Sequence, residues 1–130
     1  MKKVFLYKAG VSAFMGIVLV LSTIADANPL PSYDNIDKVY HFAAYLVMGW
    51  LWAGVFLNSF FFKEKGRAWA AAASFGISFV FGAAMEITQR YLPGRAAETG
   101  DLIANGAGAL AGAVIQMYAY KLKGRPGHET

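Results

Sequence analysis

The stretch VFLYKAGVSAFMGIVLVLSTIA, residues 4–25, contains a single charged side chain, that of Lys8. Three further apolar stretches follow, at about residues 38–62, 68–92 and 101–120. Because a helix needs about 20 predominantly apolar residues to cross a bilayer, each stretch is long enough to span a membrane. Their apolar character is continuous and lacks the alternation of strands in a membrane barrel. The sequence therefore predicts an all-α fold, a polytopic bundle of four transmembrane helices.

The composition agrees with a membrane protein. Hydrophobic residues make up 57% of the 130 positions and charged residues only 15%, whereas a soluble domain carries about 25% charged residues. We expect a single transmembrane domain over residues 1–120 and a short cytoplasmic tail over residues 121–130, which leaves no room for a soluble catalytic domain. The chain contains no Cys, so thiol nucleophiles and Cys-ligated metal centres are excluded. The basic residues are not clustered on one face, so we expect no nucleic acid partner.

Lys and Arg residues are distributed unevenly between the two sides of the predicted bundle. If the N-terminus is cytoplasmic, nine of them fall on the inner side, and only Lys38, Arg90 and Arg95 fall on the outer side. Cytoplasmic loops of membrane proteins carry an excess of Lys and Arg. We therefore expect both termini in the cytoplasm and two loops on the outer side.

The first apolar stretch also has features of a secretory signal peptide. Its basic start and the A-x-A pattern at residues 25–27 resemble a cleavable signal. About 17 apolar residues follow Lys8, however, which is longer than a usual signal core. We expect the first helix to be retained; its cleavage would leave the other three helices in the same orientation.

Polar side chains inside apolar segments are costly and call for an explanation. Here they recur at helical spacing near one end of three predicted helices. At about 1.5 Å of rise per residue, His41, Glu86 and Asn105 all lie within roughly 10 Å of the outer boundary. We therefore predict one polar site at the outer face, formed by three helices. The residues of these stripes are Asp37, His41, Tyr45, Glu86, Gln89, Arg90, Asp101 and Asn105.

Each of these residues also has a purely structural interpretation. Asp37 and Asp101 lie at helix starts, where a carboxylate caps free N–H groups and complements the helix dipole. His41 can be a core histidine bonded to a carbonyl, and Lys38 can form a solvated pair with its neighbour. Glu86 is hardest to explain in this way, because it lies about six residues inside the end of its segment. A buried Glu needs a cation or a proton.

The sequence contains DKVYHFAAY at residues 37–45, EITQ at residues 86–89, Arg95 in the following loop and DLIANGAG at residues 101–108. Taken together, in this order and spacing, these pieces resemble the VanZ-like family, whose pattern is D-K-x-x-H-F-x-x-Y, E-x-x-Q, a loop Arg and D-x-x-x-N-x-x-G. The resemblance covers about residues 37–112. It implies a small, multi-pass protein of the bacterial inner membrane, in a family named after a protein linked to teicoplanin resistance.

The resemblance also implies a shared site, and our first hypothesis is an envelope enzyme. It would act on a lipid-linked or peptidoglycan-related substrate at the periplasmic face. Glu86 would be the general acid or base with His41 as its partner, and the polar residues that begin the fourth helix would orient them. Lys38 and Arg95 would hold an anionic headgroup. The expected catalytic residues are Glu86, His41 and Asp101, and the expected substrate-binding residues are Asp37, Lys38, Tyr45, Gln89, Arg95 and Asn105.

Two other functions fit the same residues. A non-enzymatic binding or partner subunit would use them to hold the helices in register and to recognise a lipid headgroup, a glycopeptide or another membrane protein. A small transporter fits less well. Four-helix multidrug exporters carry their essential acid in the first helix, and this first helix has none.

Partners and cofactors follow from the same observations. Membrane lipids surround the helices, and a lipid-linked envelope precursor or a glycopeptide is the expected ligand. The small-xxx-small spacing of Gly108 and Gly112 allows close helix approach and would permit a homo-oligomer. We expect no cofactor and no metal, because the second histidine, His128, lies in the tail and leaves no His pair for zinc.

Overall fold

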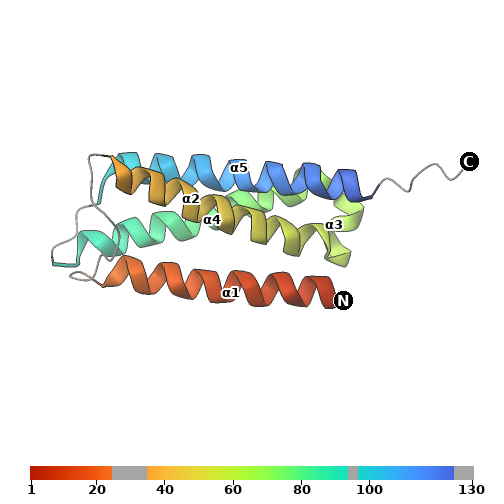
Figure 1. Ribbon diagram of the computed structural model, residues 1–130, viewed down its shortest axis with the longest axis horizontal. Helices are drawn as coiled ribbons and strands as arrows, with labels where there is room; N and C mark the ends of the chain where they lie inside the picture. Colours follow the sequence, from red (N-terminus) through yellow and green to blue (C-terminus); the bar gives the residue numbers. More distant parts are fainter. Residues whose placement is uncertain (25–34, 94–96, 125–130) are drawn as a thin grey trace, which may run out of the picture.

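The computed structural model describes residues 1–24, 35–93 and 97–124, apart from the side chains of residues 61 and 63. Four long helices lie lengthwise in one bundle, and each is long and apolar enough to cross a membrane (Figure 1). The predictions of an all-α fold and of four candidate membrane spans are therefore confirmed. The elements are α1 (Lys2–Thr23), α2 (Ile36–Leu57), α3 (Phe60–Lys65), α4 (Arg67–Arg90) and α5 (Thr99–Lys123).

The second predicted helix, at residues 38–62, is wrong at its C-terminal end. α2 ends at Leu57, and a separate short helix, α3, begins at Phe60. The Asn58 side chain donates a hydrogen bond from Nδ2 to the carbonyl of Gly54, at 2.7 Å. The last carbonyls of a helix lack backbone partners, and this side chain satisfies one of them. The helix therefore stops at Leu57, although apolar residues resume at Phe60.

Between the second and third predicted helices, residues 63–67 remain, and the observed connection is shorter than this. α3 continues to Lys65, and α4 begins at Arg67, so Gly66 alone connects the two helices. Its φ of 94° lies in the region that only glycine adopts without strain. The connection between α3 and α4 thus depends on one glycine.

The remaining boundaries lie close to the predicted ones. α4 was expected at residues 68–92 and spans Arg67–Arg90. α5 was expected at residues 101–120 and extends at both ends, to Thr99–Lys123. The first residues of the predicted tail are therefore helical. Residues 125–130 and the A-x-A pattern at residues 25–27 lie outside the described residues.

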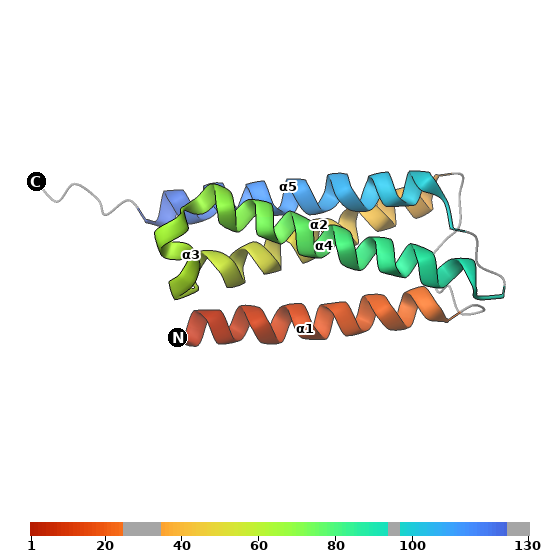
Figure 2. The same ribbon diagram turned by 180° about the vertical axis from the view of Figure 1, so that it is seen from behind.

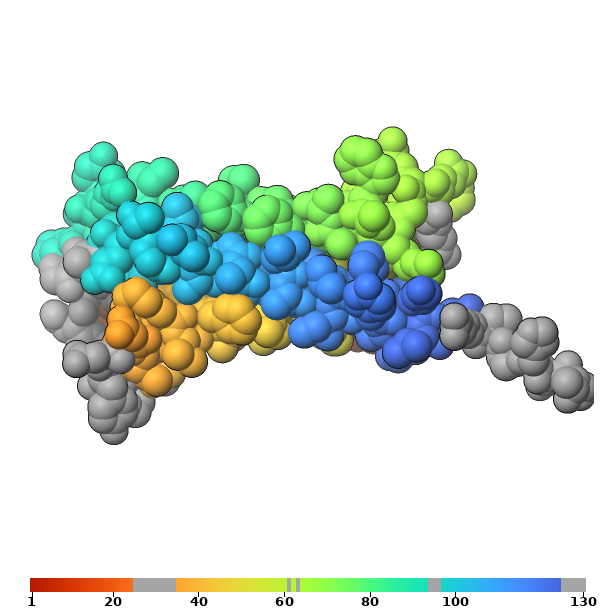
Figure 3. Space-filling model, turned by 90° about the horizontal axis from the view of Figure 1, so that it is seen from above, coloured from red at the N-terminus to blue at the C-terminus, as the bar shows by residue number. Residues whose placement is uncertain are grey.

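The closest contact in the bundle joins α2 and α5. A Cβ on Gly108 would collide with the carbonyl oxygen of Phe42, and a Cβ on Gly112 would collide with that of Leu46. The two backbones can therefore approach this closely only because these positions have no side chain. The predicted small-xxx-small contact is made within the chain; a homo-oligomer stays a prediction. Figure 3 shows α5 lying between α2 and α4.

Helix α1 lies at the side of the bundle, against α2 and, to a lesser extent, α4 (Figures 1 and 2). Its buried residues are Val11 and Val18. The ring of Tyr7 packs where a Cβ on Gly54 would lie, and its hydroxyl accepts a hydrogen bond from Gln116 Nε2 of α5, at 2.8 Å. Much of the remaining surface of α1 is exposed and apolar, which suits contact with lipid.

The helices alternate in direction, so the start of α1 and the end of α5 lie together (Figure 1). At the opposite end of the bundle meet the end of α1, the start of α2, the end of α4 and the start of α5 (Figures 1 and 2). We call this opposite end the far end. The predicted cytoplasmic location of both termini stays a prediction.

Candidate functional site

The start of α2 brings one histidine toward the interior of the far end. Residues at i, i+4 and i+8 share one face of a helix, and this face turns progressively inward along α2. Asp37 has a half-exposed side chain, His41 is partly buried and Tyr45 is fully buried. His41 thus lies between solvent and the core.

The last turns of α4 present a polar stripe to the same region. Ser78, Gly82 and Glu86 recur every four residues and are all buried, so they form the inward face of α4. Glu86 is only 6% exposed. Neither of its carboxylate oxygens has a hydrogen-bond partner among the described residues.

The first turns of α5 complete the region. Asp101 and Asn105 lie one turn apart on the face that packs against α2 and α4, with exposures of 5% and 0%. Asp101 Oδ1 has no hydrogen-bond partner within the described part of the chain. The carboxylate of Asp101 is therefore buried inside the bundle, unlike a solvent-exposed acidic residue in the first turn of a helix.

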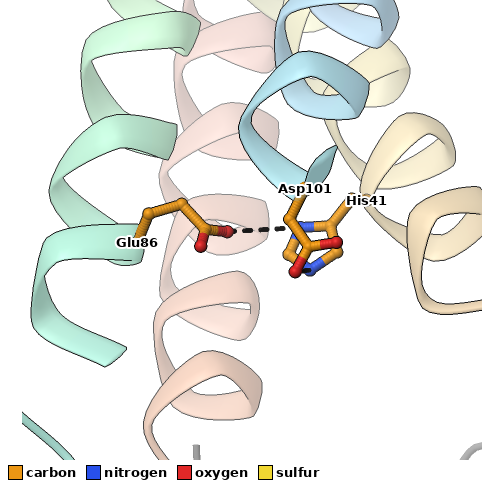
Figure 4. Close-up of side chains that lie close together, drawn as sticks. All are labelled: His41, Glu86 and Asp101. Carbon is orange, nitrogen blue, oxygen red and sulfur yellow. Dashed lines mark ion pairs between the residues drawn. The ribbon is translucent and has the colours of Figure 1, made fainter. Parts of the chain in front are cut away.

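Three ionisable side chains from three helices meet at this point, as Figure 4 shows. His41 Nε2 lies 3.6 Å from Asp101 Oδ2, and His41 Nδ1 lies 4.0 Å from Glu86 Oε1. We call His41, Glu86 and Asp101 the far-end cluster. Asn105 supports it, because its Oδ1 lies 2.9 Å from His41 Nδ1. An amide oxygen only accepts hydrogen bonds, so Nδ1 carries the hydrogen and donates it.

Lys38 lies over the start of α5, at the solvent side of the far-end cluster. Its Nζ is 3.1 Å from Glu98 Oε2 and 3.9 Å from Asp37 Oδ2. A Cβ on Gly100 would lie 2.7 Å from Lys38 Cε, so the absence of a side chain there makes room for the lysine. Lys38 thereby ties α2 to the residues that lead into α5.

Glu98 was missed by the sequence analysis. It directly precedes α5 as its N-cap residue, in a loop where no helical period identifies a functional position. A signal was nevertheless available, because it is an acidic residue three positions before Asp101, opposite a predicted outer-side Lys. Its side chain is half exposed.

The other predicted site residues lie elsewhere. Tyr45 is one turn deeper than His41. Its ring packs against Gly82 of α4, and a Cβ on Gly82 would lie 2.9 Å from the ring atom Cε1. Gln89 faces α1 and donates a hydrogen bond to the carbonyl of Ser22, at 3.3 Å. Arg95 lies outside the described residues. The structure thus brings His41, Glu86, Asp101 and Asn105 together, with Lys38 and Asp37 at the rim.

Four apolar spans around buried ionisable groups define a multi-pass, all-α membrane protein. The model of the VanZ/LLP1 family matches residues 4–120, and the chain belongs to this family. The resemblance drawn from residues 37–112 is therefore confirmed, and the match extends through the first helix. No curated protein and no solved structure matches the chain.

Proposed function

We propose that the far end faces the outside of the cytoplasmic membrane of a bacterium. There, the far-end cluster acts on the headgroup of a lipid-linked or peptidoglycan-related envelope molecule. The distribution of Lys and Arg supports this orientation, because nine of the twelve lie on the side of the two termini. If this molecule is a cell-wall precursor or a target of glycopeptide antibiotics, the protein would be linked to glycopeptide resistance.

The observation that carries this proposal is the convergence of His41, Glu86 and Asp101 from three different helices. Buried ionisable groups cost several kcal/mol each in desolvation, and a well-packed apolar core is often equally stable or more stable. Two buried carboxylates, each within 4.0 Å of one imidazole, are therefore a costly way to hold helices together. Ionisable residues at membrane depth generally mark a functional site.

The chemistry available at the site is proton transfer and binding of a polar headgroup. His41 Nε2 lies 3.6 Å from Asp101 Oδ2, so proton exchange with Asp101 requires only a small movement. Exchange with Glu86, 4.0 Å from Nδ1, requires that nitrogen to leave Asn105. Lys38 at the rim is a cation that an anionic group can reach by displacing Glu98. Arg95, which follows α4 in the sequence, is proposed as a second such cation.

The test is a comparison of lipids and peptidoglycan precursors in complemented deletion strains. Wild type and Glu86→Gln are expressed at equal levels in the membrane, with Glu64→Gln as the matched control, since Glu64 is exposed on α3 at the opposite end. We expect wild type and the control to restore the wild-type profile and Glu86→Gln to fail. Full restoration by both Glu86→Gln and His41→Ala would refute the proposal.

A non-enzymatic binding or partner subunit is the second candidate. Two contacts favour it: the His41–Asn105 hydrogen bond and the Lys38–Glu98 ion pair both join α2 to α5 or its N-cap residue. A network that only holds helices or recognises a headgroup tolerates Glu86→Asp, which keeps the charge. Catalysis does not, because the carboxylate moves by a methylene group. Full function of Glu86→Asp therefore favours binding, and its loss in a folded protein favours chemistry.

A further inference from the structure

We infer that the far-end cluster is a binding site for one first-row divalent metal cation, held by His41, Glu86 and Asp101. The inference deepens the proposed function and rests on the same site. It gives the two carboxylates the role of ligands and provides a Lewis acid that can coordinate an oxygen of the headgroup. The metal-free expectation of the sequence analysis considered only pairs of histidines.

The distances between the donor atoms fit a single ion. One donor atom from each of the three residues can be chosen so that all lie within 4.8 Å of one another. Zinc binds His nitrogen and carboxylate oxygen at about 2.0–2.2 Å, so two ligands of one ion lie about 3–4 Å apart. The measured separation of 3.6 Å between His41 Nε2 and Asp101 Oδ2 already lies in this range. Glu86 Oε1 lies 4.0 Å from the other ring nitrogen, Nδ1.

Asn105 prepares His41 for such a role. Metal-ligating histidines donate their second ring N–H to an oxygen, which fixes the tautomer and the ring orientation. His41 Nδ1 donates to Asn105 Oδ1 at 2.9 Å, which leaves a lone pair on Nε2. That nitrogen is the one directed at Asp101 Oδ2.

The unpartnered oxygens supply the second, independent observation. Both oxygens of Glu86 and Oδ1 of Asp101 are buried and lack hydrogen-bond partners among the described residues. Buried carboxylates are found paired with cations or coordinated to metals. Lys38 does not fill this role, because its Nζ is paired with the half-exposed Glu98. One divalent cation would balance the charge of Glu86 and Asp101.

The donor set selects the class of metal. Imidazole suits zinc and other transition metals, whereas magnesium and calcium prefer oxygen ligands alone. One imidazole and two carboxylates therefore favour Zn²⁺ or Mn²⁺. Three protein ligands leave at least one coordination position open, as in catalytic sites, and a phosphate oxygen of a headgroup is a suitable ligand for it. The acidic group of Asp37, Glu98 and Asp101 is less suitable, since two members are exposed and contact Lys38.

The test is metal binding by the purified full-length protein, carrying no polyhistidine tag, in lipid nanodiscs. The protein is stripped with a chelator and titrated separately with ZnCl₂, MnCl₂ and MgCl₂, and bound metal is counted by mass spectrometry. We expect one Zn²⁺ per chain, a weaker Mn²⁺ complex and no stable Mg²⁺ complex. We further expect Zn²⁺ to raise the Tm of the wild type.

Isosteric variants identify the ligands. Glu86→Gln and Asp101→Asn, judged folded by their Tm without metal, should each weaken Zn²⁺ binding at least 100-fold. Asp37→Asn and Glu98→Gln are the matched controls and should bind like the wild type. Asn105→Ala should weaken binding 10- to 100-fold, the usual effect of losing the partner of a ligating histidine.

Wild-type protein that binds no stoichiometric metal, or variants that bind as tightly as the wild type, would overturn the inference. The binding assay contains no substrate, and the envelope profile requires no purified protein. Failure of the metal inference with a defective Glu86→Gln profile leaves the proposed function intact. Metal binding by the wild type, together with an envelope profile that Glu86→Gln and His41→Ala fully restore, would support the metal site and refute the proposed function.

Discussion

His41 on α2 and Asn105 on α5 are joined by a hydrogen bond of 2.9 Å between Nδ1 and Oδ1. The bond crosses the closest helix pair of the bundle, and Asn105 is fully buried. It fixes the orientation of the imidazole ring relative to Asp101, which lies one turn earlier on α5. This single hydrogen bond therefore links the packing of α2 against α5 to the orientation of the His41 ring.

The first prediction concerns this contact. Asn105→Ala should lower the free energy of unfolding by about 1 kcal/mol, the usual contribution of a hydrogen bond between membrane helices. His41→Ala should have a similar effect, and the double variant should cost less than the two single variants combined. A denaturant titration of the purified protein in micelles measures all four free energies. Strictly additive effects would contradict a direct bond between the two side chains.

The second prediction concerns the close approach of α2 and α5. Gly112→Ala should destabilise the protein by about 1–3 kcal/mol, because the new methyl group meets the carbonyl oxygen of Leu46. Gly76→Ala on α4 is the matched control, since a Cβ there meets nothing within 4 Å. It should be neutral or stabilising by up to about 1 kcal/mol, because alanine favours helix more than glycine. Equal Tm values for the two variants would argue against the observed packing.

The third prediction separates two roles of Lys38. Lys38→Glu should abolish restoration of the envelope profile, because it places like charges beside Asp37 and Glu98. If Lys38 only fastens α2 to the start of α5, the exchanged pair Lys38→Glu with Glu98→Lys restores function. If Lys38 binds an anionic headgroup, we expect the exchanged pair to remain inactive. The proposed function requires the second outcome.

The fourth prediction is the orientation across the membrane. Fusions after residues 33, 64 and 127 should report outside, inside and inside, since the Lys and Arg bias decides the orientation. Paired reporters, one active only in the periplasm and one only in the cytoplasm, give a positive signal for either location. An outside signal after residue 64 would reverse the bundle and put the far-end cluster in the cytoplasm.

The fifth prediction is the pH dependence of metal binding. Zn²⁺ affinity should fall as the pH is lowered, because protons compete with the metal for the imidazole and carboxylate ligands. Zinc titrations of the wild type at a series of pH values measure the loss. Binding that does not change with pH would show that protonatable side chains are not the ligands.

The helices could be predicted well because hydropathy alone determines which segments enter a bilayer. The break between α2 and α3 was missed, because the apolar run resumes at once after the two polar residues Asn58 and Ser59. At that break, the Asn58 side chain donates a hydrogen bond to the Gly54 carbonyl. The spacing of apolar residues does not reveal such a local side-chain contact. Gly66 marks the reversal, but its φ of 94° is known only from the structure.

The far-end cluster could be predicted because helical spacing and depth together locate Glu86, His41 and Asp101. Spacing was less reliable for Gln89, which is three residues from Glu86. A step of three residues rotates the side chain away by about 60° on a 3.6-residue helix, and Gln89 faces Ser22 of α1 instead. Glu98 was missed because a loop residue has no periodic neighbours that reveal its direction.

Gly108 and Gly112 carry no reactive group, yet they determine how far α5 stands from α2. The separation of His41 from Asp101 depends on that spacing, because the two residues lie on these two helices. A search for inactive mutants should therefore recover glycine substitutions in the middle of α5 as well as changes at the far end. Such mutants would retain every polar residue of the site and fail because a gap between donor atoms has widened beyond the reach of one ion.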